Sequence, residues 1–121
     1  MTALNTFGAI MTRAIELETA LADYFTRAGN KRLAAACNKR RSRMARVRRE
    51  AVLEITLEAI DGLDSDNYEL ALEDLSEDGQ RRVATTAARF YREVAPVINV
   101  RQARRALERA AREHASQLEG A

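Results

Sequence analysis

The fold is decided by residues 7–30, which read FGAIMTRAIELETALADYFTRAGN. Apolar side chains recur there every three or four residues, the period of a helix with one buried face. The inward positions are Phe7, Met11, Ala14, Leu21, Phe25 and Ala28. Glu18 stands on the same stripe, where its carboxylate would be buried. Because Gly29 and Asn30 favour a turn, we expect a helix over 5–28 with one charged residue in its apolar face.

Three further segments carry the same helical period. The predicted helices cover 31–60, 77–95 and a last stretch from about 100 to 118, with Pro96 separating the last two. Residues 61–76 form an acidic connector, in which we expect a short helix from Tyr68 to Leu75. The sequence therefore predicts an all-α fold in one domain over 1–121: a four-helix bundle with a partly helical crossover between its second and third helices.

Composition narrows the class of protein. The chain has only 5 Gly and 1 Pro among 121 residues, which favours long helices. It has a single cysteine, so an internal disulfide is excluded. The sequence has no apolar run of about 18 residues and no signal-peptide pattern at its start, so we expect a cytoplasmic protein without a membrane segment. Nucleotide-binding loops, nucleophile elbows and zinc or calcium motifs are missing, so an enzyme is not favoured.

The last predicted helix carries a second polar residue on its apolar stripe. This stripe comprises Val100, Ala103, Leu107, Ala110 and His114. At about 1.5 Å per residue, Glu18 and His114 should lie at the same end of the bundle. A carboxylate and an imidazole on apolar faces are either a hydrogen-bonded buried pair or two ligands of an incomplete metal site. The sequence leaves both interpretations open.

The second predicted helix places Arg40 on its inward seam, between Cys37 and Met44. A buried guanidinium needs an acidic partner, so we expect an ion pair between Arg40 and Glu18 or a neighbouring acid. Cys37 is either a small core residue or a reactive thiol, because the cations that follow it would favour the thiolate.

Charge is divided between two blocks of the chain. Residues 31–49 carry nine Lys or Arg and no acid, whereas residues 50–78 carry eleven Asp or Glu and no base. The candidate anion-binding residues are Lys39, Arg41, Arg43, Arg46, Arg48 and Arg49. Complementary blocks predict a homodimer or another acidic protein partner. Nucleic acid ranks behind these, because no aromatic residue is interleaved with the bases and no helix-turn-helix spacing is present.

The stretch AIELETALADYFTRAG at 14–29 resembles the first helix of the ferritin-like superfamily, in particular its rubrerythrin-type bundles. The aromatic pairs in ADYFTRA (22–28) and ARFYREV (88–94) suggest two similar hairpins. The resemblance implies a di-iron site, with Glu18 and His114 at two of its ligand positions. The other ligand positions would fall on Cys37, Arg40, near Ala84 and on Ala111, none of which matches. The resemblance thus implies a degenerate member, in which the fixed charge of Arg40 replaces the metal.

Three functions follow from these observations. The first is a non-catalytic ferritin-like protein that acts through protein–protein interaction as a homodimer and needs no cofactor. The second is an atypical metal-binding protein or oxidoreductase that holds iron or another divalent metal at Glu18 and His114. The third is a nucleic-acid-binding protein that uses the basic segment 39–49.

Overall fold

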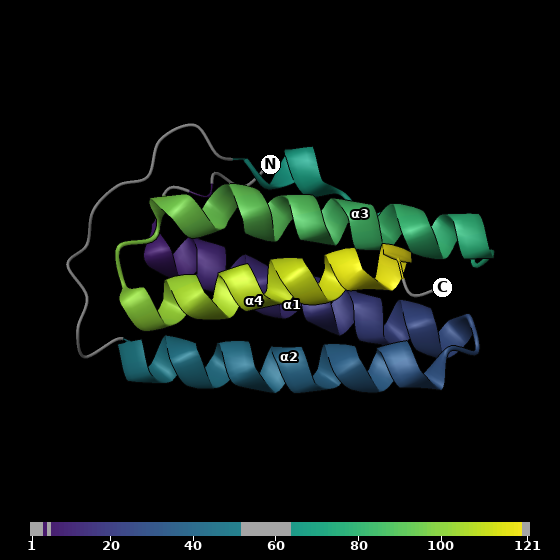
Figure 1. Cartoon of the computed structure of the whole chain (residues 1–121), viewed down its shortest axis with the longest axis horizontal. Coiled ribbons are helices and arrows are strands. Elements are labelled where there is room, and N and C mark those ends of the chain that lie inside the picture. The colour runs from purple at the N-terminus through teal and green to yellow at the C-terminus, as the bar shows by residue number, and fades with distance from the viewer. Residues whose placement is uncertain (1–3, 5, 52–63, 120–121) are drawn as a thin grey trace.

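The computed structural model describes residues 4, 6–51 and 64–119, which form an all-α bundle (Figure 1). The four long helices are α1 (Phe7–Arg27), α2 (Lys31–Ala51), α3 (Glu77–Val94) and α4 (Arg101–Glu119). Two short 3-10 helices accompany them: η1 (Ser65–Tyr68) and η2 (Ala95–Val97). The helical prediction is confirmed for all four segments. The predicted extension of the second helix over 52–60 lies outside the described residues.

The helices pack as two hairpins, α1 with α2 and α3 with α4, and α2 also contacts α4. Asn30 Nδ2 donates to Gln80 Oε1 at 3.0 Å, which places the α1–α2 turn beside the start of α3. Gln102 Nε2 donates to Glu50 Oε2 at 2.6 Å, which places the end of α2 beside the start of α4. Accordingly, α1 and α4 run in one direction and α2 and α3 in the other, as Figure 1 shows.

Local chemistry explains where the helices begin and end. Thr6 Oγ1 accepts from the Ala9 amide at 3.0 Å at the start of α1, and Ser76 Oγ accepts from the Gly79 amide at 3.2 Å at the start of α3. These side chains satisfy amides that have no partner inside the helix. Gly29 follows α1 with a φ of 77°, a conformation that glycine adopts without strain.

The connector before α3 differs from the prediction. Residues 69–76 are not helical, and the only turn of helix in the described part of the connector is η1, which Asp64 caps. Tyr68 is buried, and Leu70 and Leu72 pack against the core. This alternation of every second residue is that of an extended chain with one face covered. The expected helix from Tyr68 to Leu75 is therefore wrong, because its apolar residues have a period of two.

The core lies between the helices and consists of the apolar helix faces that the sequence predicted. All six aromatic side chains are at most 6% exposed: Phe7, Tyr24, Phe25, Tyr68, Phe90 and Tyr91. Among the described residues, Glu18, Arg40 and His114 are the buried polar or charged side chains. The core thus contains one polar cluster, and its surroundings are apolar.

Gly79 should resist substitution although it lies within a helix. A Cβ at this position would collide with the backbone of Asp74, where the connector packs against α3. We expect Gly79→Ala to lower the free energy of unfolding by about 1–3 kcal/mol, the usual effect of overpacking. Gly8→Ala in α1 is the control, because nothing lies within 4 Å of its Cβ. Urea denaturation of both variants measures the difference, and equal stability of the two would contradict this packing.

Candidate functional site: a buried ion network

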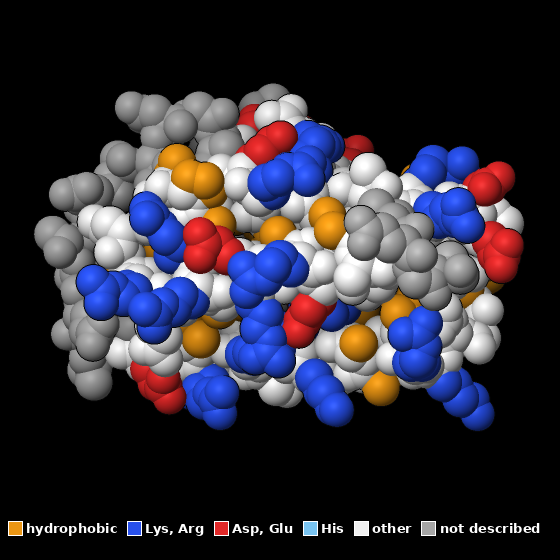
Figure 2. Space-filling model, viewed as in Figure 1, with side chains coloured by type: hydrophobic (Ala, Val, Ile, Leu, Met, Phe, Trp, Pro, Cys, Tyr) orange, Lys and Arg blue, Asp and Glu red, His pale blue; other side chains and the backbone are white. Residues whose placement is uncertain are grey.

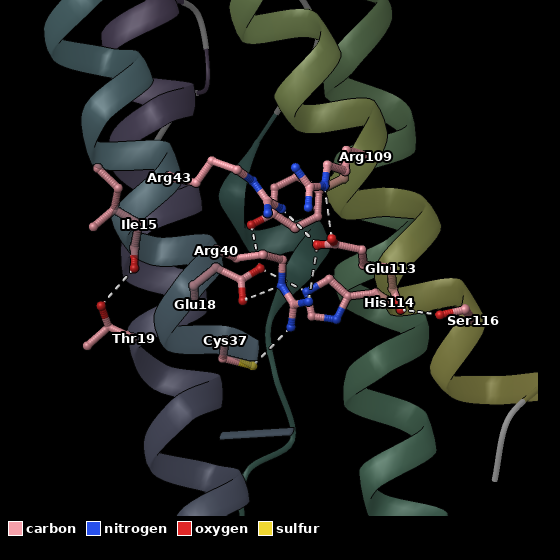
Figure 3. A network of polar contacts seen from close by, with 11 residues as sticks. Ile15, Glu18, Thr19, Cys37, Arg40, Arg43, Arg109, Glu113, His114 and Ser116 are labelled. Atoms are coloured by element: carbon pink, nitrogen blue, oxygen red, sulfur yellow. Dashed lines mark hydrogen bonds and ion pairs between the residues drawn. The ribbon is translucent and has the colours of Figure 1, made fainter. Parts of the chain in front are cut away.

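Glu18 of α1 is the centre of a polar network in the core, and Figure 3 shows the side chains of Arg40 and His114 directed toward it. Its side chain is 0% exposed. Arg40 of α2 donates from Nε to Oε1 at 3.0 Å, and Tyr91 of α3 donates from Oη to Oε2 at 2.6 Å. His114 of α4 places Nε2 2.8 Å from the same Oε2. The network therefore joins all four helices at one carboxylate.

The hydrogen bond assigns the tautomer of His114. Because the Glu18 carboxylate can only accept, the ring nitrogen that faces it, Nε2, carries a hydrogen. His114 Nδ1 is buried and has no hydrogen-bond partner among the described residues. The imidazole also stacks on Tyr91, with ring centroids 5.8 Å apart and planes at 10°. Packing and hydrogen bonding together hold the ring in one orientation.

Arg40 connects this core to the edge between α2 and α4. Its Nη2 donates to Cys37 Sγ at 3.2 Å, and its Nη1 donates to Glu113 Oε1 at 3.4 Å. Glu113 also accepts from Arg43 Nη2 at 2.7 Å and from Arg109 Nε at 3.1 Å. Glu113 is 31% exposed in its side chain, so the network extends from the dry core to a solvent-accessible edge.

The network favours the ionised forms of its acid and base. Burial by itself would raise the pKa of Glu18, but the contact with His114, the charge of Arg40 and the hydrogen bond from Tyr91 together lower it below 4.5. Burial works against the charge of Arg40, yet the charge of Glu18 raises the pKa of the guanidinium. Burial and the charge of Glu18 raise the pKa of Tyr91 well above 10, so its hydroxyl remains a donor.

Cys37 is not placed to be a reactive thiol. Its side chain is 0% exposed, and burial together with the charge of Glu18 raises its pKa to about 12. Burial and the Glu18 carboxylate thus speak against the interpretation of a reactive thiol. Arg40 works in the opposite direction, but it offsets the rise in pKa only in part. Cys37 instead accepts a hydrogen bond in the core.

The residues around Glu18 do not fit a di-iron centre. In the part of the chain that the structure describes, no group of three or more His, Cys, Asp or Glu side chains is arranged to hold a metal ion. Both oxygens of Glu18 accept hydrogen bonds from protein donors. The guanidinium of Arg40 also brings a fixed positive charge to the position where a cation would approach. Glu18 and His114 are therefore side by side, but as an ion network and not as a ligand set.

The basic residues of α2 differ in whether an acidic residue of the described chain balances their charge. Arg43 is bound to Glu113, so its charge is balanced within the chain. Arg41 is half-buried, while Lys39, Arg46, Arg48 and Arg49 are exposed. Among the described residues, no ion pair joins the basic segment 31–49 to the acidic segment 50–78; the partners of Arg40 and Arg43 are Glu18 and Glu113.

Sequence reasoning missed Tyr91 and Glu113 as members of the network. Tyr91 carried a signal, since a tyrosine on a buried face needs a partner for its hydroxyl. Glu113 carried a weaker one: it lies next to His114 and four residues after Arg109, which is the spacing of a helical ion pair.

Comparison with known proteins found no matching protein-family model, no similar curated protein and no similar solved structure. None of the helices in the described part of the chain is both long enough and apolar enough to span a bilayer. Fold and site thus define a four-helix bundle with a buried ion network.

Proposed function

We propose that this chain is a non-catalytic, ferritin-like helical-bundle protein that acts through protein–protein interaction as a homodimer. The ferritin-like part of the proposal is supported by the common direction of α2 and α3, which requires the connector between them to cross the bundle from end to end. It is also supported by Glu18 and His114, which meet at one level of the core. In a degenerate ferritin-like protein of this kind, the fixed positive charge of Arg40 replaces the charge of the metal.

The closed network is the single observation that carries the non-catalytic proposal. A catalytic carboxylate needs a free oxygen and a path for substrate. Glu18 is fully buried, and each of its oxygens already accepts from a neighbour. The carboxylate is thus committed to holding the helices together.

The homodimer is supported by charges that the described chain does not balance internally. Lys31 and Arg32 are exposed on α2, and Glu69, Glu73 and Glu77 are exposed in the acidic segment. Exposed ion pairs contribute only about 0.2–1 kcal/mol each. Leu75 and Val97 are the exposed large apolar side chains among the described residues. The dimer should therefore be weak and sensitive to salt.

Two measurements test this function. Light scattering at low salt should give about twice the chain mass of 13.5 kDa, falling towards that mass as salt rises. A single-chain mass at low salt and high concentration would exclude the dimer. Elemental analysis after anaerobic loading with iron should find far less than one iron per chain. Two bound irons per chain would exclude a degenerate ferritin-like protein without a metal site and would favour the metal-binding alternative.

A further inference from the structure

Two rows of cations lie side by side on α2 and α4. Lys39, Arg43 and Arg46 have helical spacing i, i+4, i+7, and Arg105, Arg109 and Arg112 repeat that spacing on α4. Arg43 and Arg109 both contact Glu113, which places the centres of the two rows next to each other. The remaining four side chains are exposed on either side of this contact. We call these six residues the basic face; Figure 2 shows Lys and Arg side chains gathered over α2 and α4.

We propose that the basic face binds the phosphate backbone of duplex nucleic acid, independently of its sequence. The proposal goes beyond the homodimer, since it assigns this face a partner of another class. Arg side chains form paired hydrogen bonds with phosphate oxygens, and binding releases counterions from the duplex. The surface is also hollowed on α2, where Asn38, Lys39, Ser42, Arg43 and Arg46 line a shallow depression. The amide and hydroxyl there add short-range donors for phosphate.

The dimensions of the basic face suit a duplex. Each row covers eight residues, with about 10 Å of helix between its first and last members, which corresponds to about three nucleotides of one strand. Arg43 and Arg109 bind the same carboxylate, so cations of both rows lie close enough together to contact phosphates of one duplex.

The acidic residues near the basic face do not cancel its positive charge. Glu113 lies between the rows and is balanced by Arg40, Arg43 and Arg109. Glu108 is exposed on α4, and Glu50 accepts from Gln102 at the end of α2. The outer cations Lys39, Arg46, Arg105 and Arg112 have no ion-pair partner among the residues described.

Burial of the aromatic residues favours a duplex over other partners. Proteins that bind single strands stack bases on aromatic side chains, and all six aromatics here are in the core. Protein partners are usually held by aromatic or large apolar anchors, and the basic face presents none. What remains for recognition is charge and hydrogen bonding, which duplex phosphates provide.

Fluorescence anisotropy with a short labelled DNA duplex, measured across a range of salt concentrations, tests the proposal. The double variant Lys39→Gln/Arg46→Gln should bind about tenfold more weakly. The slope of log affinity against log salt concentration should also fall, by the equivalent of about two phosphate contacts. Arg105→Gln/Arg112→Gln should have the same effect from α4, so the test does not depend on one variant folding. Arg41→Gln/Arg48→Gln is the matched control: same helix, spacing and charge change, but the opposite flank of α2 by helical periodicity.

Each outcome decides the proposal. Loss of binding in the two face variants with retention in the control supports it. Failure of the unmodified protein to bind the duplex at low salt overturns it, as does an equal loss in the control. Displacement of the duplex by a polyglutamate peptide at matched charge would also overturn it, by assigning the face to acidic protein. Light scattering on the same samples reports the oligomer separately, so failure of the homodimer is distinguishable from failure of duplex binding.

Discussion

Replacing Arg40 with methionine is expected to lower the free energy of unfolding by about 3–5 kcal/mol. The Arg40 side chain is 3% exposed, and its Nε lies 3.0 Å from Glu18 Oε1. Methionine has a similar length and fills much of the same space, so the loss comes from leaving the Glu18 charge in the core without its cation. His114 and Tyr91 still donate to the carboxylate, but neither carries the fixed charge of arginine. Chemical denaturation measures the change.

Two controls separate the charge effect from the loss of packing. Arg41→Met alters the neighbouring, half-buried residue, which has no ion pair among those described, and should change stability by about 0.5 kcal/mol or less. Arg40→Met combined with Glu18→Gln should recover part of the loss, because the uncompensated charge is removed. If Arg40→Met unfolds at the same denaturant concentration as the parent, Arg40 is solvated and the buried network does not exist.

Substituting Glu18 by glutamine is expected to cost about 3 kcal/mol near neutral pH and to weaken the acid dependence of stability. The pKa of Glu18 is lower in the folded protein than its ordinary value, so the unfolded chain binds a proton more readily. The stability that this difference provides is fully present above pH 4.5 and is lost as pH falls through the lower folded pKa. The parent protein should therefore lose stability on acidification, and Glu18→Gln should lose less over the same interval.

Glu113→Gln provides the matched comparison for this effect. The pKa of Glu113 is also lowered, because the hydrogen bonds and charges of Arg43 and Arg40 outweigh the effect of burial. Its side chain is 31% exposed, so solvent screens the pairs and the change should be smaller. Urea denaturation at pH 7 and at about pH 3 measures both variants. Equal acid sensitivity in the parent and Glu18→Gln would contradict the lowered pKa of Glu18.

Helical periodicity was sufficient to place much of this molecule. The stripes of the first, second and last helices brought Glu18, Arg40 and His114 inward, because a period of 3.6 residues assigns each position to a face. The end of α1 and the boundary between α3 and α4 followed from Gly29 and Pro96, which interrupt a helix locally. These features are local, so a single sequence contains them.

The features that were missed depend on contacts between distant segments. Tyr91 donates to Glu18 across 73 positions, and no local pattern shows which helix supplies that hydroxyl. The sequence left the character of Cys37 open, because a count of nearby bases does not show that burial opposes the thiolate. The prediction of a helix in the connector was wrong because Leu70 and Leu72 pack against the core that the long helices form. These contacts override the helical tendency of the neighbouring residues.

The network also bears on how the helices align along their axes. Both α3 and α4 bury several alanines, including Ala84, Ala87, Ala103 and Ala110. Small side chains of this kind offer similar packing after one helix slides by a turn, about 5.4 Å. The same slide would move Tyr91 or His114 away from Glu18 and leave the buried carboxylate without one of its hydrogen-bond partners. The Glu18 carboxylate thus locks the axial register that the small apolar side chains alone would leave degenerate.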